Sequence, residues 1–293
     1  MINHSLFYCK NKDNYPPFKN GLYLEEYFLD FFIKNTPLLK RKYIPALWTN
    51  FQIERWFDEK KQEMQDALNT WLANNPPGEE GYFTVVQHDD GPKLQLPENT
   101  IIYGACSCNI PIPLIYQDVN HTLLNMNKKK FHEKEFLCSF VGNDTNYVRR
   151  LVLNSKILNE IPSFKIINSG GWSPDVNQDL QQTFIQTTIN SKFALAPRGY
   201  GRGSFRFFEC FLLGTIPVYV WDDVEWLPFK ELIDYKRLCV SIHIYDLNDL
   251  EKILLSIDEQ QYSSMWNYYH EVKYLFELEG MSCEIIRQNL VNN

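Results

Sequence analysis

A glycine-rich turn at 197–203 carries the residues best suited to binding an anion, because Arg198 and Gly199 lie within it. Ser204 follows as a candidate N-cap, and the predicted helix runs to about residue 213. The free amides and the positive dipole of a helix start favour a negatively charged ligand. The turn and the helix start therefore predict a phosphate or diphosphate site.

The predicted helix carries two opposite charges on one face, because Arg206 and Glu209 are three residues apart. They can form an ordinary exposed ion pair, worth roughly 0.2–0.5 kcal/mol. Alternatively, most of their neighbours are apolar, and buried charges are costly unless partners compensate them. In that case a diphosphate would satisfy the arginine, and the paired hydroxyls of a ribose would satisfy the carboxylate of Glu209.

A second group of ionisable residues, His88-Asp89-Asp90-Gly91, follows another apolar run. Strand ends in open α/β sheets face the ligand crevice, so a base here could take a proton from a reacting hydroxyl. A carboxylate beside another carboxylate can have a raised pKa, which suits that task. Asp-Gly is also a common turn pair, so an ordinary turn at the end of a strand remains an alternative.

Alternating strands and helices are predicted to position both groups, which indicates parallel sheets in both halves of the chain. Gly214 suits the residue after a helix end. Strands are predicted at 6–9, 43–48, 82–87, 100–105, 110–114, 136–142, 164–168, 193–196, 216–221 and 239–243. Helices are predicted at 21–35, 53–73, 145–159, 178–190, 204–213, 247–257 and from 261 onward.

Length and composition limit the class of protein. A chain of 293 residues exceeds the usual size of one hydrophobic core, so two domains are expected. The net charge of −7 and the lack of a long basic run argue against a nucleic-acid partner. No apolar run reaches the length of a membrane span, and the 7 scattered cysteines fit a reducing compartment. We expect a cytoplasmic protein.

Six short motifs resemble those of the exostosin-like glycosyltransferases, glycosyltransferase family 47, in both order and spacing. They are PRG at 197–199, SFRFFE at 204–209, LGTIPV at 213–218, Asp222, LPF at 227–229 and Asp234-Tyr235. The resemblance implies a GT-B-like α/β fold with two Rossmann-like domains whose parallel sheets face a central cleft. Many eukaryotic members resemble Golgi proteins with an N-terminal anchor, so the alternative to the cytoplasm is a Golgi enzyme whose membrane anchor has been removed. We assign 1–135 to the acceptor side and 136–275 to the nucleotide-sugar side, with a C-terminal helix at 276–293 that packs back on the first domain.

The resemblance also suggests roles for individual residues. His88-Asp89-Asp90-Gly91 resembles an H-D-x-G segment of plant-type members, which makes Asp89 the first choice for the base. Relatives often have an aromatic residue where Asp90 stands, so His88 and Asp90 remain alternatives. Phe140-Val141-Gly142 followed by Arg149 or Arg150 resembles an F-x-G…R segment. One of these arginines reaches the phosphates, or they are ordinary surface residues.

The predicted reaction moves a monosaccharide from a UDP-sugar to a hydroxyl of a glycan, with inversion at the anomeric carbon. Arginines and amides stabilise the leaving UDP, and no metal is expected because the sequence has no D-x-D spacing at Asp222-Asp223. The acceptor is an oligosaccharide or a glycoprotein glycan, and the plant-type resemblance weakly favours UDP-xylose. The alternative is a noncatalytic module that binds nucleotide sugars or glycans, or a partner subunit of a transferase.

Overall fold

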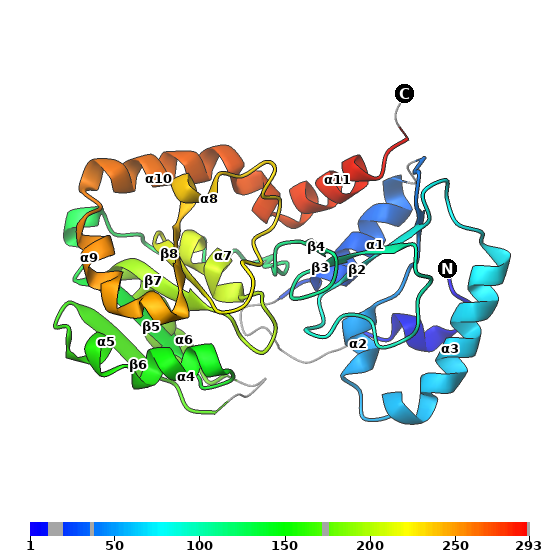
Figure 1. Ribbon diagram of the computed structural model, residues 1–293, viewed down its shortest axis with the longest axis horizontal. Helices are drawn as coiled ribbons and strands as arrows, with labels where there is room; N and C mark the ends of the chain where they lie inside the picture. The colour runs from blue at the N-terminus through cyan, green and yellow to red at the C-terminus, as the bar shows by residue number, and fades with distance from the viewer. Residues whose placement is uncertain (11–19, 36–37, 172–175, 292–293) are drawn as a thin grey trace. The chain divides into compact units, whose positions relative to one another are not determined.

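The computed structural model describes residues 1–10, 20–35, 38–171 and 176–291. The chain divides into two compact units. Unit 1 contains the N-terminal segment from Met1, Gly21–Gln117 and Tyr274–Asn293, and unit 2 contains Asp118–Lys273. Each unit has its own parallel sheet (Figure 1), which confirms the α/β class.

Unit 1 is built on a four-stranded parallel sheet with the strand order β1-β2-β3-β4. Its helices and strands are η1 (Ser5–Tyr8), α1 (Leu24–Asn35), β1 (Lys42–Tyr43), α2 (Trp48–Gln52), α3 (Phe57–Asn74), β2 (Tyr82–Val86), β3 (Thr100–Gly104), β4 (Ile110–Pro111) and α11 (Leu278–Gln288), and η4 (Lys273–Phe276) joins it to unit 2.

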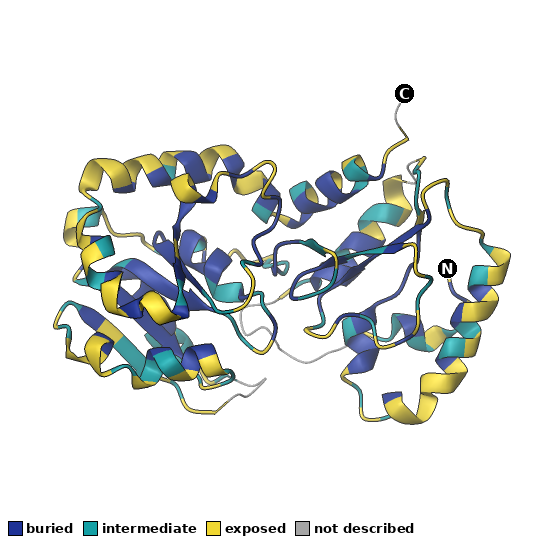
Figure 2. Cartoon of the chain, in the orientation of Figure 1, coloured by how far each residue is buried: buried dark blue, intermediate teal, exposed yellow. Residues whose placement is uncertain are grey.

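The short helix α2 is fixed to the centre of this sheet. Trp48 is fully buried, and its Nε1 donates a hydrogen bond of 2.8 Å to Oγ1 of Thr84 on β2. The Thr84 hydroxyl in turn donates to the carbonyl of Ile44 at 2.9 Å. Phe7 packs edge-on against both Trp48 and Phe51. The buried strands and α2 appear dark blue in Figure 2.

Unit 2 is built on a five-stranded parallel sheet with the order β6-β5-β7-β8-β9. Its elements are η2 (Phe131–Glu133), β5 (Phe136–Gly142), α4 (Tyr147–Asn154), α5 (Lys156–Glu160), β6 (Phe164–Asn168), α6 (Gln178–Ile189), β7 (Ser191–Pro197), α7 (Phe205–Leu212), β8 (Ile216–Trp221), α8 (Tyr235–Leu238), β9 (Val240–His243), η3 (Ile244–Asp249), α9 (Leu250–Leu255) and α10 (Glu259–Val272).

The strand order of unit 2 reverses between β5 and β7. From β5 the chain goes to β6 on one side, then returns to β7 on the other side and continues outward to β9. In open α/β sheets, ligands bind outside the carboxyl ends of the strands at such a reversal. Here these ends are Gly142 of β5 and Pro197 of β7, so the topology points to the same region as the glycine-rich turn.

Helix α7 follows β7 and packs on β7 and β8. Phe211 of α7 stacks on Tyr269 of α10 with a centroid separation of 4.3 Å, and Phe207 packs edge-on against Tyr219 of β8. The helix ends as predicted, because Gly214 has a φ of +77° that non-glycine residues rarely adopt. This packing sets the direction of the helix start that faces the strand ends.

Several predicted elements differ from the structure, and three of them have a clear local cause. Residues 6–9 form part of the 3₁₀ helix η1 instead of a strand, because short apolar runs do not distinguish the two. The strand predicted at 43–48 is only β1, since Pro45 lacks the amide that would continue the ladder. The helix predicted at 145–159 is split at Ser155, whose hydroxyl accepts from the amide of Leu158 and caps α5.

The connecting residues 118–135 pack with unit 2. Phe131 contacts the ring of Tyr262, and the buried Lys134 donates to the carbonyl of Ile189. At the other end of the chain, Asn289 donates to the Tyr103 hydroxyl of β3, so α11 belongs to unit 1. Which unit takes the acceptor and which the nucleotide remains a prediction.

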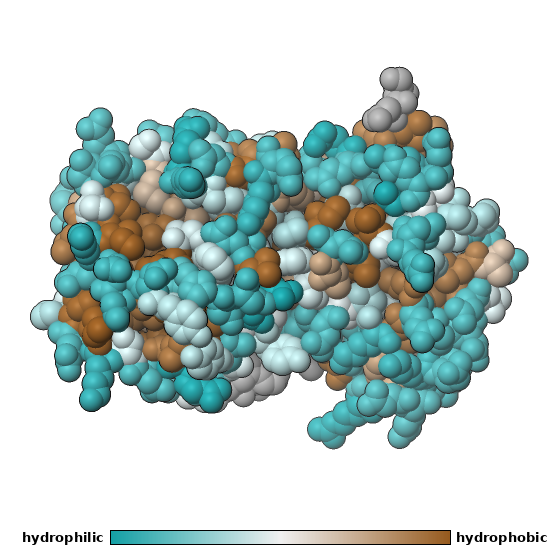
Figure 3. All heavy atoms as spheres, viewed as in Figure 1, coloured by the Kyte–Doolittle hydropathy of each residue, from teal (hydrophilic) through white to brown (hydrophobic). Residues whose placement is uncertain are grey.

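No helix among the described residues combines the length and the apolar character that a membrane span requires. On the face shown in Figure 3, hydrophobic residues form separate patches among hydrophilic ones.

Candidate functional site

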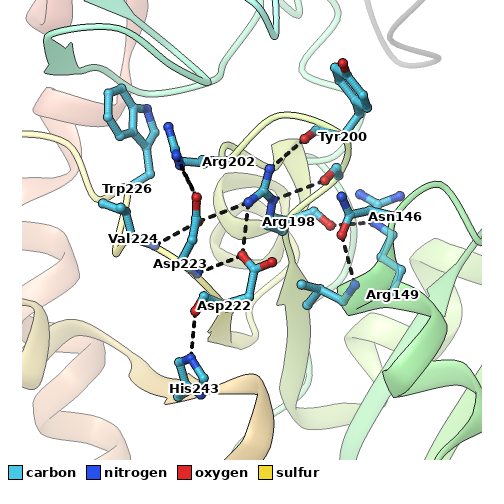
Figure 4. Close-up of polar contacts among 12 residues, drawn as sticks. Asn146, Arg149, Arg198, Tyr200, Arg202, Asp222, Asp223, Val224, Trp226 and His243 are labelled. Atoms are coloured by element: carbon cyan, nitrogen blue, oxygen red, sulfur yellow. Dashed lines mark hydrogen bonds and ion pairs between the residues drawn. The ribbon is translucent and has the colours of Figure 1, made fainter.

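Arg149 of α4 connects the carboxyl ends of β5 and β7. Its Nε donates to the Arg198 carbonyl at 3.2 Å, and its Nη1 donates to Asn143 Oδ1 at 3.1 Å. Only 9% of Arg149 is exposed. Gly199 lies beside this guanidinium, because a Cβ there would be in ordinary van der Waals contact with Arg149 Nη2, at 3.6 Å. The structure thus places a buried guanidinium at the strand-order reversal (Figure 4).

Arg206 of α7 also reaches the end of β5. Its Nε donates to the carbonyl of Val141 at 2.8 Å, and its guanidinium lies over the rings of Phe140 and Phe184. A Cβ on Gly142 would meet Phe140 at 2.6 Å and Arg206 Nη2 at 3.2 Å. Glycine at this strand end therefore leaves room for the Phe140 ring, and the Arg206 guanidinium lies next to it.

The start of α7 contains a buried polar atom that lacks a partner. Ser204 occupies the N-cap position as predicted, but its side chain makes no capping hydrogen bond. Its Oγ is buried and has no hydrogen-bond partner among the described residues. Because buried polar atoms are nearly always hydrogen-bonded, this hydroxyl is suited to a ligand at the helix start.

Arg198 and Arg202 are held by two carboxylates that follow β8. Arg198 Nη1 lies 3.0 Å from both Asp222 Oδ1 and Asp223 Oδ1, while Arg202 Nε donates to Asp223 Oδ2 at 2.9 Å (Figure 4). The bond from Arg202 keeps the pKa of Asp223 far below its usual range. His243 of β9 extends the network, since its Nε2 donates to the Asp222 carbonyl at 2.7 Å. The role of Asp222 and Asp223 as partners of these arginines was not predicted.

The remaining predicted residues of unit 2 lie in different environments. Arg150 is exposed, and its Nε lies 3.2 Å from Asp144 Oδ1, so it points away from Arg149. Glu209 is 7% exposed on α7, on the helix that carries Arg206. Trp172, whose indole ring is of a kind that can stack on a sugar or a base, lies outside the described residues. The structure therefore brings together Gly142, Arg149, Gly199, Ser204 and Arg206.

In unit 1, residues 88–91 form a tight turn directly after β2. The amide of Gly91 donates to the His88 carbonyl at 3.0 Å, and Gly91 has a φ of +73°. A Cβ on Gly91 would lie 2.4 Å from Cys108 Sγ, so only glycine fits here. Both the turn and the strand-end position were predicted.

The imidazole of His88 is already engaged within the turn. Its Nδ1 accepts a hydrogen bond of 3.2 Å from the amide of Asp90. Burial, and then the charge of Lys93, lowers the pKa of His88. A neutral ring with an accepting Nδ1 carries its proton on Nε2, so that nitrogen is a donor and cannot take a proton. This geometry disfavours His88 as the base.

The two carboxylates of the turn also differ. Asp90 Oδ2 lies 3.9 Å from the ammonium of Lys93. Asp89 is exposed and makes no hydrogen bond or ion pair within the described part of the chain. Asp89 thus presents a carboxylate that can accept a proton from another molecule, and its assignment as the base remains a prediction.

Behind this turn lies Glu25, a carboxylate that is only 2% exposed. It accepts from the amide of Gln87 at 2.6 Å, and from the hydroxyl and amide of Thr49 at 2.7 and 2.9 Å. Burial raises the pKa of Glu25 to about 7, and the hydrogen bonds from Gln87 and Thr49 only partly oppose this rise.

Glu25 is therefore expected to make stability depend on pH. The pKa of Glu25 in the folded protein, about 7, exceeds the ordinary 4.5. The contribution of Glu25 to the free energy of unfolding is therefore full below pH 4.5 and is lost as the pH rises through 7. This amounts to about 3 kcal/mol of unfolding free energy. Glu25→Gln should remove this pH dependence, as measured by urea unfolding at pH 4.5 to 8, whereas Asp30→Asn on the exposed face of α1 should retain it. If the free energy of unfolding changed with pH in the same way in wild type and in Glu25→Gln, the pH dependence could not be assigned to Glu25.

Comparison with models of protein families shows which family this chain belongs to. The model of the exostosin GT47 domain matches residues 105–257. The chain belongs to the exostosin GT47 family. The family resemblance seen in the motifs is thus confirmed, and the match includes the residues assembled at the ends of β5 and β7. Loop 88–91 lies outside the matched segment.

Several family members resemble this GT47 chain locally. The exostosin-1 homolog of Caenorhabditis elegans is 32% identical over 107 residues, which is 36% of this chain and 28% of that protein. The probable glucuronosyltransferase GUT1 of Oryza sativa subsp. japonica is 34% identical over 83 residues, which is 28% of this chain and 20% of that protein. The probable beta-1,4-xylosyltransferase IRX10 of Arabidopsis thaliana is 32% identical over 83 residues, which is 28% of this chain and 20% of that protein. The chain thus matches less than a third of each relative's length.

Among solved structures, TarM is similar to this chain at a TM-score of 0.39 and 8% identity, over 76% of this chain and 52% of that one. This likeness is too weak to support an argument about fold or function.

Proposed function

We propose that this GT47 chain is an inverting glycosyltransferase that moves a monosaccharide from a UDP-sugar to a hydroxyl of a glycan. The observation that carries the proposal is the meeting of Arg149, Arg206 and the start of α7 at the strand-order reversal of unit 2. We further propose a GT-B-like arrangement, as the family implies, with the donor on unit 2 and the acceptor on unit 1.

The diphosphate of the donor is assigned to the start of α7. The amides of this helix start, the Ser204 hydroxyl and the guanidinium groups of Arg149 and Arg206 supply donors and positive charge. Each charge-assisted hydrogen bond contributes about 1.5–3 kcal/mol. These groups would stabilise the negative charge that develops on UDP as it leaves. The carboxylate of Glu209, the fifth residue of α7, is assigned to the ribose hydroxyls.

The guanidinium of Arg198 is engaged within the protein. Two carboxylates hold its guanidinium, while its own carbonyl accepts from Arg149. We propose that Arg198 shapes the 197–203 turn and orients Arg149, instead of contacting the diphosphate as its main task. Arg202 has a similar structural role, because its guanidinium is paired with Asp223.

Asp89 is assigned as the general base that takes the proton of the acceptor hydroxyl. Its exposure, its lack of partners within the described residues and the donor tautomer of His88 support this choice over His88 and Asp90. The alternative function, a noncatalytic binding module or partner subunit, would need no such base. Substitution of Asp89 therefore separates the two.

The identity of the sugar and the compartment remain predictions. Relatives are named for transfer of glucuronate and xylose, and we retain a weak preference for UDP-xylose and for an oligosaccharide or glycoprotein-glycan acceptor. All 7 cysteines are free thiols, which supports a reducing compartment such as the cytoplasm.

Transfer is expected to continue in EDTA, because guanidinium groups and a helix start take the place of a cation at the leaving group. Asp222 and Asp223 are paired with arginines, and no group of three or more potential ligands for a metal occurs among the described residues. Release of UDP should be measured with and without EDTA. Complete loss of activity that manganese restores would contradict this leaving-group assignment.

A further inference from the structure

Loop 88–91 is hydrogen-bonded near both ends by buried side chains that lie outside it. We propose that these two residues, Glu25 and Gln52, are positioning residues that fix the Asp89 carboxylate for proton abstraction. The inference rests on the proposed function, and it extends the acceptor side beyond loop 88–91.

Glu25 holds the residue that precedes the loop. One of its oxygens accepts from the amide of Gln87, and both oxygens accept from Thr49 in the first turn of α2. Each partner is a donor, and the carboxylate is almost fully buried. Glu25 therefore cannot reach an acceptor sugar, and it instead connects the end of β2 to the start of α2.

Gln52, the last residue of α2, holds the other end. Its Nε2 donates to the Gly91 carbonyl at 3.0 Å, and its Oε1 accepts from the amide of Lys93 at 2.6 Å. The side chain is 5% exposed. A carbonyl must accept and an amide must donate, so these two partners also fix which way the Gln52 amide points.

Both anchors act through one rigid element. Helix α2 carries Thr49 and Gln52, and the bond from Trp48 to Thr84 fixes that helix to β2, the strand that leads into the loop. Cys108 Sγ also lies close to Gly91. Asp89 has no partner of its own within the described residues, so its position depends on these backbone anchors. Displacing a reacting group by about 1 Å can cost roughly 100-fold in rate.

Gln52→Glu tests the second anchor by changing one group. The new carboxylate can still accept from Lys93, but it cannot donate to Gly91, and it places an oxygen against a carbonyl oxygen. We expect kcat to fall about 10- to 100-fold while KM for the UDP-sugar changes less than about twofold. Hydrogen exchange of the peptide that spans 87–93 should become faster in the folded variant.

A matched control lies in the same unit. Gln65 of α3 makes the same pair of hydrogen bonds to a single loop residue, Gln95, accepting from its amide at 2.7 Å and donating to its carbonyl at 3.1 Å. Gln65→Glu should leave kcat within about twofold of wild type, because Gln95 lies outside loop 88–91. Gln52→Met, which removes both bonds without adding charge, should reproduce the loss of kcat if Gln52→Glu fails to fold.

A double-mutant cycle with Asp89→Asn separates positioning from general stability. If Gln52 acts through Asp89, Gln52→Glu should have almost no further effect on the rate in the Asp89→Asn background. An unchanged kcat in Gln52→Glu, or an equal loss in both backgrounds, would overturn the inference. Full activity of Asp89→Asn alone would instead refute the base assignment, and the exchange of 87–93 would then still report whether Gln52 holds the loop.

Discussion

Asp89→Asn is expected to lower the rate of sugar transfer by about 10²–10⁴-fold, the usual contribution of a general base. Asparagine keeps the shape of the side chain and removes the basic oxygen. Affinity for UDP should stay nearly unchanged, because the proposed nucleotide contacts all lie in unit 2. Steady-state release of UDP in the presence of a glycan acceptor, together with UDP titration by calorimetry, measures both quantities.

The neighbours of Asp89 provide the controls for this result. Asp90→Asn should have a smaller effect, since Asp90 lies near Lys93, and His88→Ala should act mainly by loosening the turn. If Asp90→Asn or His88→Ala abolishes turnover while Asp89→Asn retains it, the base has been assigned to the wrong residue of the turn. If all three variants keep full turnover, the base lies elsewhere in the chain.

Arg149→Met is expected to weaken UDP binding roughly 10- to 100-fold, because it removes a charge-assisted contact to the diphosphate. Methionine keeps much of the buried volume at a side chain that is 9% exposed. The increase in melting temperature caused by millimolar UDP should shrink accordingly, since a ligand that binds only the folded state stabilises it in proportion to its affinity. Arg206→Met should have a similar effect.

Arg150→Met is the matched control for this experiment. It removes the same type of charge from the next residue of α4, where the guanidinium is exposed and paired with Asp144. Its UDP-induced shift should equal that of wild type. A normal shift in a folded Arg149→Met variant, or an equal loss in both variants, would show that the diphosphate lies elsewhere.

The sequence predicted the local anatomy of the nucleotide site well, because that anatomy depends on short-range signals. The apolar run before Pro197, the N-cap position of Ser204 and the positive φ at Gly214 each follow from neighbouring residues. The pairing of Arg198 with Asp222 depends instead on the register of two strands, which places Pro197 beside Val220. That register could have been inferred only after the parallel pairing of β7 with β8 was assumed.

The acceptor side was harder to predict. The turn at 88–91 was visible from Asp-Gly, but Glu25 and Gln52 lie 39 to 62 residues from the groups they hold. Such contacts depend on the packing of α1 and α2 against β2, and hydrophobic periodicity does not fix them. Likewise, the difference between Arg149 and Arg150 depends on the exact rotation of α4, which places the first toward β7 and the second toward Asp144.

The most direct test of the account follows the reaction itself by proton NMR, with a panel of UDP-sugars and glycan acceptors. Transfer from an α-linked UDP-sugar should yield a β-linked product together with free UDP, because a single displacement assisted by Asp89 inverts the anomeric carbon. An α-linked product would contradict the proposed single displacement. Absence of any transfer by a folded protein that binds UDP would contradict the central claim and favour a noncatalytic binding module.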